Sequence, residues 1–165
     1  MKTQDELRER IATFTSLAGV KLRNQNSNCE LIQVFIYTNR FRQDLPQYSG
    51  YKTVKLPFPT SSTFELNKYA QIALNSIYKT GYNYKKAGVI LMGISQDETQ
   101  QLSMFEYENP KHKVLMNVLD KMNIKMGDKV KFGGQDLKRK WKMKQESLSP
   151  CYSTNLKDII TINCK

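Results

Sequence analysis

The chain has 165 residues, of which 39% are hydrophobic, and its 26 lysines and arginines outnumber 15 acids to give a formal net charge of +11. This hydrophobic content supports a folded core and excludes wholesale disorder, and the length suits one domain or a small domain with an appended module. No apolar run approaches the roughly 20 residues that span a bilayer, and the polar N-terminus has no signal-peptide pattern. The charge points to an anionic partner, of which nucleic acid and anionic membranes are the usual ones.

The cysteines indicate the redox environment. Cys29, Cys151 and Cys164 are odd in number and lack the paired spacing of metal ligands. Free thiols in a reducing compartment are the expected state. We therefore expect a cytoplasmic protein with no membrane partner.

The first part of the chain predicts a helix followed by two strands. Thr3 and Glu6 have capping-box spacing, and apolar residues then recur every three or four positions, so a helix is expected over about residues 4–23. Residues 31–38 are rich in β-branched and aromatic types and predict a strand, and residues 52–56 predict a shorter one. The two strands are expected to pair as an antiparallel hairpin. The side chains expected to face the core are Ile32, Val34, Ile36, Val54 and Leu56.

A second helix and a third strand follow. Ser62 and Glu65 form another capping box, Gly81 is expected to end the helix, and residues 87–94 predict the strand. The order α-β-β-α-β favours an α+β fold, a small antiparallel sheet with two helices on one face. The other face would carry lysine and aromatic side chains, and it suits either a nucleic-acid platform or a covered interface. The core positions expected here are Leu66, Ala70, Ala73, Leu74, Ile77, Val89 and Leu91.

A polar linker over residues 95–109 separates this domain, residues 1–94, from the rest. Five consecutive residues in the linker include large apolar side chains, which either fold back onto the protein or bind the groove of a partner. Position alone leaves both alternatives open. The five residues are Gln101, Leu102, Ser103, Met104 and Phe105.

Residues 110–165 predict a small, basic, mixed α/β module. Asn109 and Pro110 have N-cap and N1 chemistry and predict a helix start. Every second residue over 137–144 is a lysine. This period of two predicts a strand that exposes a row of lysines on one side and turns Trp141, on the other side, toward the core. The apolar residues expected to pack in this module are Leu115, Val118, Leu119 and Met122 in the helix, then Val130 and Phe132, and finally Ile159, Ile160 and Ile162.

Catalytic chemistry is scarce in the sequence. The single histidine, His112, lies between two lysines and is expected to be a solvated surface residue. Asp97 and Glu98 are adjacent in the linker, whereas polymerase-type metal binding needs carboxylates that converge from the strands of one sheet. Gly133 and Gly134 lack the spacing of a phosphate-binding loop. We expect no catalysis, no metal and no cofactor for this chain alone.

A set of short motifs occurs in order along the chain, at residues 38–41, 54–56, 84–89, 101–105, 141–144, 148–150 and 152–154. In this order and spacing, the motifs resemble the C-terminal part of the UmuC-type subunit of DNA polymerase V, a Y-family translesion polymerase. The resemblance runs from about residue 3 to residue 162 and rests on the set rather than on any one motif.

The resemblance implies that residues 1–94 are the little finger, which grips template-primer duplex through its sheet. The family domain has the order β-α-β-β-α-β, so its first strand and the palm with its metal-binding carboxylates would lie upstream of Met1. Without the palm the chain would not polymerise DNA by itself, and it would be a fragment or a shortened gene product. A sheet edge left open by the absent strand would favour self-association by edge pairing.

The resemblance also implies that residues 101–105 are the clamp-binding peptide of bacterial polymerases, whose usual form is Gln-Leu-x-Leu-Phe. Met104 replaces the second leucine, a nearly isosteric change. Gln101 would bond at the rim of the sliding clamp's cleft, and the three apolar side chains would fill it. The alternative is that Leu102 and Phe105 pack against the C-terminal module.

The same resemblance predicts non-sequence-specific phosphate contacts, as lesion bypass requires. A second candidate surface is the lysine row at 138–144. The competing hypothesis is a non-catalytic interaction module that regulates the clamp, a recombinase filament or the polymerase's accessory subunit without binding DNA. The residues predicted to contact DNA are Arg40, Arg42, Lys52, Lys55, Lys85 and Lys86.

Overall fold

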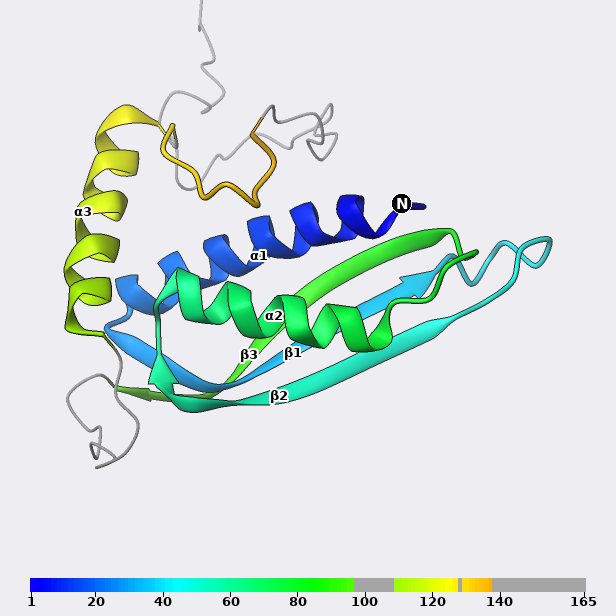
Figure 1. The fold of residues 1–165 in the computed structure, drawn as a ribbon, viewed down its shortest axis with the longest axis horizontal. Helices are drawn as coiled ribbons and strands as arrows, with labels where there is room; N and C mark the ends of the chain where they lie inside the picture. The colour runs from blue at the N-terminus through cyan, green and yellow to red at the C-terminus, as the bar shows by residue number, and fades with distance from the viewer. Residues whose placement is uncertain (97–108, 128, 138–165) are drawn as a thin grey trace, which may run out of the picture.

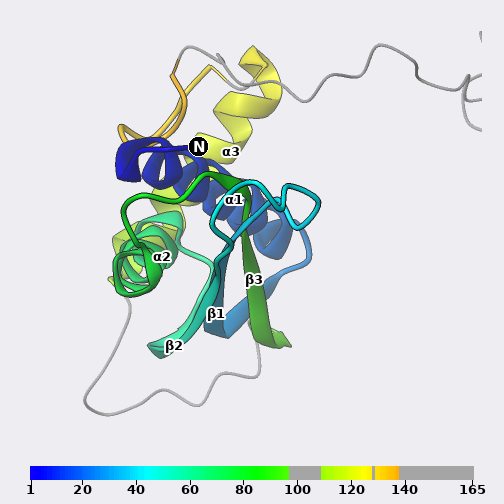
Figure 2. The same cartoon turned by 90° about the vertical axis from the view of Figure 1, so that its right-hand side faces the viewer.

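The computed structural model describes residues 1–96, 109–127 and 129–137 of the chain. Within them, a three-stranded antiparallel sheet carries helices α1 and α2 on one face, and helix α3 lies across the end of that helical layer (Figure 1). Turned by 90°, the view shows both helices on the same side of the strands (Figure 2). The predicted α+β fold and the order α-β-β-α-β are confirmed.

Helix α1, Gln4–Asn24, begins at the predicted capping box. The backbone N–H of Glu6 donates to the Thr3 hydroxyl at 3.3 Å, and the Glu6 carboxylate accepts from the backbone N–H of Thr3 at 3.5 Å. A shorter bond of 2.8 Å from the backbone N–H of Lys2 is the main reason why the pKa of Glu6 is lowered. The apolar face of the helix, with Leu7 and Ile11 fully buried, packs toward the sheet and α2.

The sheet has the order β2-β1-β3, with β1 (Ser27–Thr38) between β2 (Ser49–Thr60) and β3 (Tyr84–Gln96). All three strands are longer than the sequence predicts. Strand β2 continues through Pro57 and Pro59 because it is an edge strand, where the missing N–H group of proline breaks no ladder. The predicted hairpin of β1 with β2 is confirmed.

The core lies between the sheet and the two helices. Ile32, Val34 and Ile36 of β1 have no exposed surface, as predicted, and Leu56 is also buried. Val54, Val89 and Leu91, on the two edge strands, are partly buried against the same cluster. The expected inward residues of α2 are confirmed too, namely Leu66, Ala70, Ala73, Leu74 and Ile77.

Helix α2, Thr63–Ile77, differs from the prediction at both ends. Ser62 is the N-cap, but its side chain makes no capping hydrogen bond, so the predicted capping box with Glu65 is wrong. The Ser62 hydroxyl instead lies 3.4 Å from Nδ1 of His112. The helix ends at Ile77, before Gly81, and Gly81 has a φ of +90° in the turn that leads to β3.

The first residue of the chain forms backbone hydrogen bonds with the outer edge of β3. The Met1 amino group donates to the carbonyl of Tyr84, and the backbone N–H of Tyr84 donates to the carbonyl of Met1, both at 2.9 Å. Two residues that exchange both hydrogen bonds form a pair of the antiparallel type. Met1 therefore begins a fourth line of pairing on the side of β3 that faces away from β1.

Helix α3, Pro110–Met126, starts as predicted. The side chain of Asn109 accepts from the backbone N–H of Lys111 at 3.0 Å, and Gly127 closes the helix with a φ of +72°. The buried residue of the described helix is Met116, whereas the expected stripe is largely exposed: 42% for Leu115, 47% for Val118 and 40% for Met122. Met116 faces inward because Asp120, one turn later, forms the ion pair described below, and the expected packing with residues 159–162 lies outside the described residues.

Candidate nucleic-acid interface

The sheet face opposite the helices is the candidate interface. Cross-strand partners share a face, so the side chains on this open face follow from the register. Its positions carry two lysines and no acid. They are Leu31, Gln33, Phe35 and Tyr37 of β1, then Ser49, Tyr51, Thr53 and Lys55 of β2, and Lys86, Gly88, Ile90 and Met92 of β3.

Aromatic rings occupy the middle of this face. Phe35 is paired with Gly88, where an added Cβ would lie 2.4 Å from the Phe35 ring, so the ring lies over a position that only glycine leaves free. Phe35 stacks on Tyr37 with 5.6 Å between ring centroids and 21° between planes. On the other side of Phe35 its β2 partner, Tyr51, is 71% exposed. The Phe35 and Tyr37 rings thus form a stacked pair, with the Phe35 ring over β3, and Tyr51 is the register partner of Phe35 on β2.

Four lysines and one acid lie on the three strands, and they do not all share a face. Lys55 and Lys86 lie on the open face, and Lys86 Nζ is 5.7 Å from the centroid of the Tyr37 ring. Lys52 is the register partner of Val34, whose side chain is buried on the helix side of the sheet. The side chain of Lys52 therefore leaves the edge strand β2 on the helix side, not on the open face. Lys85 is exposed at the irregularity where the β1–β3 register shifts.

The remaining predicted contacts, Arg40 and Arg42, lie on the exposed β1–β2 hairpin loop with Phe41, whose exposure is 94%. The guanidinium of Arg42 makes two hydrogen bonds to the carboxylate of Asp44, at 2.7 and 2.5 Å. These bonds raise the pKa of Arg42 and lower the pKa of Asp44. The charge of Arg42 is thus paired with that of Asp44. Asp44 is the one acid of this loop, so the loop offers Arg40 no second carboxylate.

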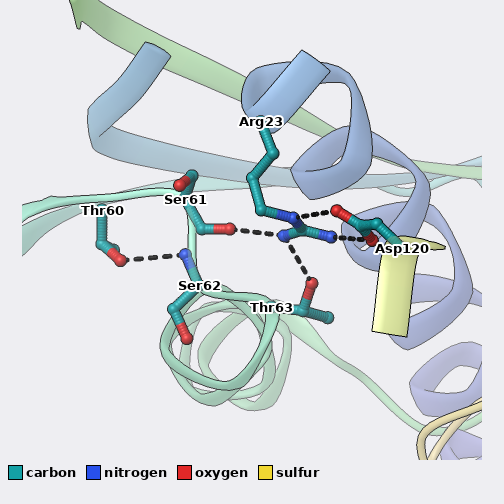
Figure 3. A network of polar contacts seen from close by, with 6 residues as sticks. All are labelled: Arg23, Thr60, Ser61, Ser62, Thr63 and Asp120. Carbon is teal, nitrogen blue, oxygen red and sulfur yellow. Dashed lines mark hydrogen bonds and ion pairs between the residues drawn. The ribbon is translucent and has the colours of Figure 1, made fainter. Parts of the chain in front are cut away.

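A second constellation joins α1, the start of α2 and α3 (Figure 3). Arg23 donates to both carboxylate oxygens of Asp120, at 2.6 and 2.9 Å, and also to the carbonyl of Ser61 and the hydroxyl of Thr63. The two charged side chains are only 9% and 16% exposed. A bidentate arginine–carboxylate pair demands one relative orientation, so this contact sets the rotation of α3 and turns Met116, one helical turn earlier, inward.

A cavity of about 610 Å³ lies beside this ion pair, between α1, α3 and residues 130–136. Its walls are mainly apolar and include Leu17, Phe64, Leu119 and Phe132, and the Arg23–Asp120 pair forms its polar end. Val130 is held there by two bonds with the side chain of Asn123, at 3.0 and 2.9 Å.

The described residues hold no group of three or more His, Cys, Asp and Glu side chains that could bind a metal ion. Burial raises the pKa of the Cys29 thiol to about 12, and its Sγ lies 3.6 Å from the carbonyl of Thr60. His112 was expected to be a solvated surface residue, and this is wrong: its ring contacts Ser62 and lies 5.6 Å from that of Phe64. In the same described ranges, no helix combines the length and apolar character needed to cross a membrane.

Two predicted features lie outside the described residues. The pentapeptide Gln101, Leu102, Ser103, Met104 and Phe105 is one, and the lysine row at 138–144 with Trp141 is the other. Both stay predictions. So does the division into a domain, a linker and a C-terminal module.

Two groups of residues in these sites were not predicted from the sequence. Gly88 within a strand was a usable signal, because a strand glycine often marks a close approach by another group, and that group is Phe35. The Arg23–Asp120 pair joins positions 97 residues apart, and nothing in a single sequence links them.

Two family models match the chain. Residues 1–104 match the impB/mucB/samB family C-terminal domain, and residues 113–162 match a domain of unknown function. The first model covers the whole sheet domain, and the second begins inside α3.

Some curated relatives match nearly the whole chain, and another matches about half of it. Protein ImpB of Salmonella typhimurium is 33% identical over 158 residues, 94% of this chain and 37% of the relative. Protein UmuC of Salmonella typhimurium (strain LT2) is 32% identical over 161 residues, 96% of this chain and 38% of the relative. The putative UV-damage repair protein UvrX of Bacillus subtilis is 36% identical over 78 residues, 47% of this chain and 18% of the relative. The chain thus spans less than two fifths of the length of these relatives.

Proposed function

The chain belongs to the impB/mucB/samB family through its C-terminal domain, and from this premise we propose that it is the DNA-binding and clamp-binding region of an error-prone translesion DNA polymerase in SOS repair. Residues 1–94 grip template-primer duplex without reading its sequence. Residues 101–105 tether the protein to the sliding clamp. Polymerisation itself belongs to catalytic residues elsewhere in such an enzyme, not to this chain alone.

The observation that carries the DNA-binding part is the charge of the sheet's open side. Lys55 and Lys86 lie on that face without an acid beside them in the register, and the chain as a whole has a net charge of +11. Lysines that contact phosphates supply affinity without sequence information. A polymerase that copies damaged templates needs this kind of contact.

The test is binding of a labelled primer-template duplex by fluorescence anisotropy at several salt concentrations. Lys55→Gln and Lys86→Gln are each expected to weaken binding and to reduce the slope of log affinity against log salt by about 1. Lys21→Gln, an exposed lysine near the end of α1 on the helical layer, is the matched control and should change neither quantity. A salt-independent affinity would contradict the proposal.

Lys52, Lys85, Arg40 and Arg42 are also proposed to contact DNA, and the same assay ranks them. Lys52→Gln should have a smaller effect than Lys55→Gln because Lys52 starts from the helix side of the strand. Asp44→Asn should strengthen binding, since it removes a negative charge and releases Arg42 from its ion pair. Equal effects at Lys52 and Lys55 would place the interface at the edge of β2 rather than on the open face.

The clamp tether rests on the pentapeptide motif. Burial of one large apolar side chain stabilises a complex by about 1.5–3 kcal/mol, so two or three anchors suffice for micromolar affinity after the cost of ordering. Replacing Leu102 and Phe105 by alanine should abolish clamp binding and leave the far-UV circular dichroism spectrum unchanged, whereas Ser103→Ala should retain binding. Undiminished affinity of the double variant would refute the tether.

The competing function is a protein-interaction module that acts on the clamp, a recombinase filament or the polymerase's accessory subunit without touching DNA. One observation favours it: the open face also carries Leu31, Ile90 and Met92, and Ile90 is 44% exposed. Exposed apolar surface often marks a protein interface. A mobility shift on primer-template DNA, run beside a clamp titration, separates the two functions, because this alternative predicts clamp binding with no shift.

A further inference from the structure

We propose that Phe41, on the loop of the β1–β2 hairpin, is a wedge that inserts between neighbouring base pairs of duplex DNA. The proposal rests on the proposed function in one respect, that duplex DNA is the ligand of the sheet domain. It adds an apolar contact to the phosphate-binding charges. It also predicts that the protein prefers a duplex in which base stacking is already weakened, such as one with a mismatched pair.

The exposure of the ring is the first observation. Phe41 is 94% exposed, more than any other large hydrophobic side chain in the part of the chain that the structure describes. The loop that carries it projects beyond the ends of both helices that cover the sheet (Figure 1), so the ring can approach a large ligand without meeting the helical layer. A single exposed apolar side chain indicates no partner by itself, so the residues around it carry the argument.

Positive charge surrounds the ring. Its two sequence neighbours, Arg40 and Arg42, are both exposed, and Lys86 lies on the open face at the end of the sheet nearest the loop. Asp44 is the one acid of the loop. An apolar ring between cations matches a ligand with phosphates on its outside and flat bases inside. Membrane binding scales with the apolar area that is buried, and one ring supplies little of it.

Hydrogen bonds fix the backbone on both sides of the ring. The backbone N–H of Phe41 donates to the side-chain oxygen of Asn39 at 3.3 Å, and that of Arg42 donates to the carbonyl of Asn39 at 3.1 Å. The side-chain amide of Gln47 donates to the carbonyl of Arg42 at 2.6 Å and accepts from the Thr38 hydroxyl at 2.7 Å. A loop that is ordered before binding loses less conformational entropy on binding.

The base of the loop is anchored to the body of the domain. Tyr48, at the end of the loop, exchanges backbone hydrogen bonding with Thr38, whose N–H donates to the Tyr48 carbonyl at 3.0 Å and whose hydroxyl accepts from the Tyr48 N–H at 3.1 Å. The Tyr48 hydroxyl donates to the carbonyl of Ile77, the last residue of α2, at 2.7 Å, and its ring lies 5.2 Å from that of Tyr82. A side chain that separates stacked bases needs such a rigid support.

Insertion has a signature that phosphate contacts lack. Proteins that kink duplex DNA insert apolar side chains, phenylalanine among them, between base steps and partly unstack them. The cost of unpairing and unstacking is lowest at a mismatched or damaged base. Two duplexes that differ in one mismatch carry the same phosphates, so charge alone distinguishes them little. A preference for the mismatched duplex therefore reports the wedge.

The experiment measures the affinity of the full chain for two labelled duplexes of equal length, one of which has a central mismatch beside a 2-aminopurine. The unaltered chain should bind the mismatched duplex about tenfold more tightly, a modest part of the cost of unstacking one step. The fluorescence of 2-aminopurine should rise on binding, because the base is unstacked. Phe41→Ala should bind the two duplexes with affinities within about twofold, abolish the fluorescence rise and keep the salt slope.

Three further variants separate the ring from the charges. Phe41→Leu keeps an apolar wedge and should retain the preference. Arg40→Gln should lower the slope of log affinity against log salt by about 1 and also retain the preference. Ile124→Ala removes an apolar side chain that is 81% exposed on α3, and as the matched control it should change neither quantity. Circular dichroism checks the folding of each variant.

The outcomes distinguish the wedge from the proposed function. If Phe41→Ala keeps the preference, or if the unaltered chain binds both duplexes equally with a steep salt dependence, the wedge is overturned and the proposed function stands. If the unaltered chain binds neither duplex, both are overturned. Binding to phosphatidylserine vesicles that Phe41→Ala abolishes would assign the ring to a membrane surface and would also overturn the wedge.

Discussion

The sheet domain and helix α3 are held in place by different kinds of contact. In the sheet domain, side chains from two helices and three strands form one buried apolar cluster. Helix α3 has a single buried residue, Met116, and exposes apolar side chains such as Val114 at 65% and Ile124 at 81%. Its orientation comes from the bidentate pair of Arg23 with Asp120.

The two regions should therefore respond to different substitutions. Apolar burial is non-directional, and its stabilisation is summed over many side chains. The stability of the sheet domain should therefore change little when a surface charge is removed and fall when a buried methyl group is removed. A partly buried ion pair depends on the geometry of two groups, and removing one leaves the other without its partner. Helix α3 should therefore respond to a single substitution that leaves the sheet domain unaffected.

The largest expected effect is in the core of the sheet domain. Ile36→Ala removes a fully buried side chain of the central strand and should lower the free energy of unfolding by about 2–5 kcal/mol. Urea unfolding followed by circular dichroism measures it. Ile90→Ala, on the open face, is the matched control and should cost less than about 1 kcal/mol. Equal losses would mean that the open face is part of the core.

The next effect is at the helix contact. Asp120→Ala should destabilise the docking of α3 by about 1–3 kcal/mol, because Arg23 keeps its bonds to Ser61 and Thr63 but loses the carboxylate. Hydrogen exchange should show faster amide exchange in α3 and unchanged exchange in β1. Replacing the exposed Asp5 by alanine is the control. The double variant Arg23→Met with Asp120→Leu should restore most of the protection.

A smaller effect depends on pH. Burial raises the pKa of Cys29 to about 12 from its ordinary value of 9.0, so the folded state holds the thiol proton more tightly than the unfolded state does. This stabilisation is complete below pH 9 and declines as the pH rises toward 12. At pH 10 the loss is about 1.4 kcal/mol. Cys29→Ala should lose less stability than the unaltered chain between pH 8 and 10; parallel curves would contradict the prediction.

The smallest effect separates two routes of self-association. The edge of β2 contains Pro57 and Pro59, which hinder pairing with another strand, whereas β3 has no proline and an apolar sequence. Concentration-dependent sedimentation is expected, and Ile94→Lys on β3 should reduce it more than Ile124→Lys on α3. A larger reduction from Ile124→Lys would assign the contact to the helix, and a concentration-independent monomer would exclude both routes.

The sheet domain was largely predictable because its signals are local. Alternation placed Ile32, Val34 and Ile36 on one face, and the spacing of Thr3 and Glu6 predicted the start of α1. The C-terminal end of β2 was missed because the strand crosses Pro57 and Pro59, a sequence that a central strand would not tolerate. Pro57 and Pro59 are compatible with a strand because β2 lies at the edge of the sheet, and the sequence alone does not give that position.

The contacts between distant segments were not predictable. The capping box at Ser62 failed, and the Ser62 hydroxyl lies beside His112, 50 residues away. The pairing of Asp120 with Arg23 was not predicted, because a lone carboxylate on a helix is normally a solvated residue. At the candidate interface, the basic residues were named as lying at strand ends and on the open sheet face, and the register places only Lys55 and Lys86 on that face.

The exchange of hydrogen bonds between Met1 and Tyr84 has a practical consequence for labelling the protein. Residues joined ahead of Met1, such as an affinity tag, would run antiparallel to β3 along its outer edge. Such a tag would occupy the edge expected to mediate self-association, and its sequence would decide how well that edge is shielded. Tagged and untagged preparations should therefore be compared before any oligomeric state is assigned.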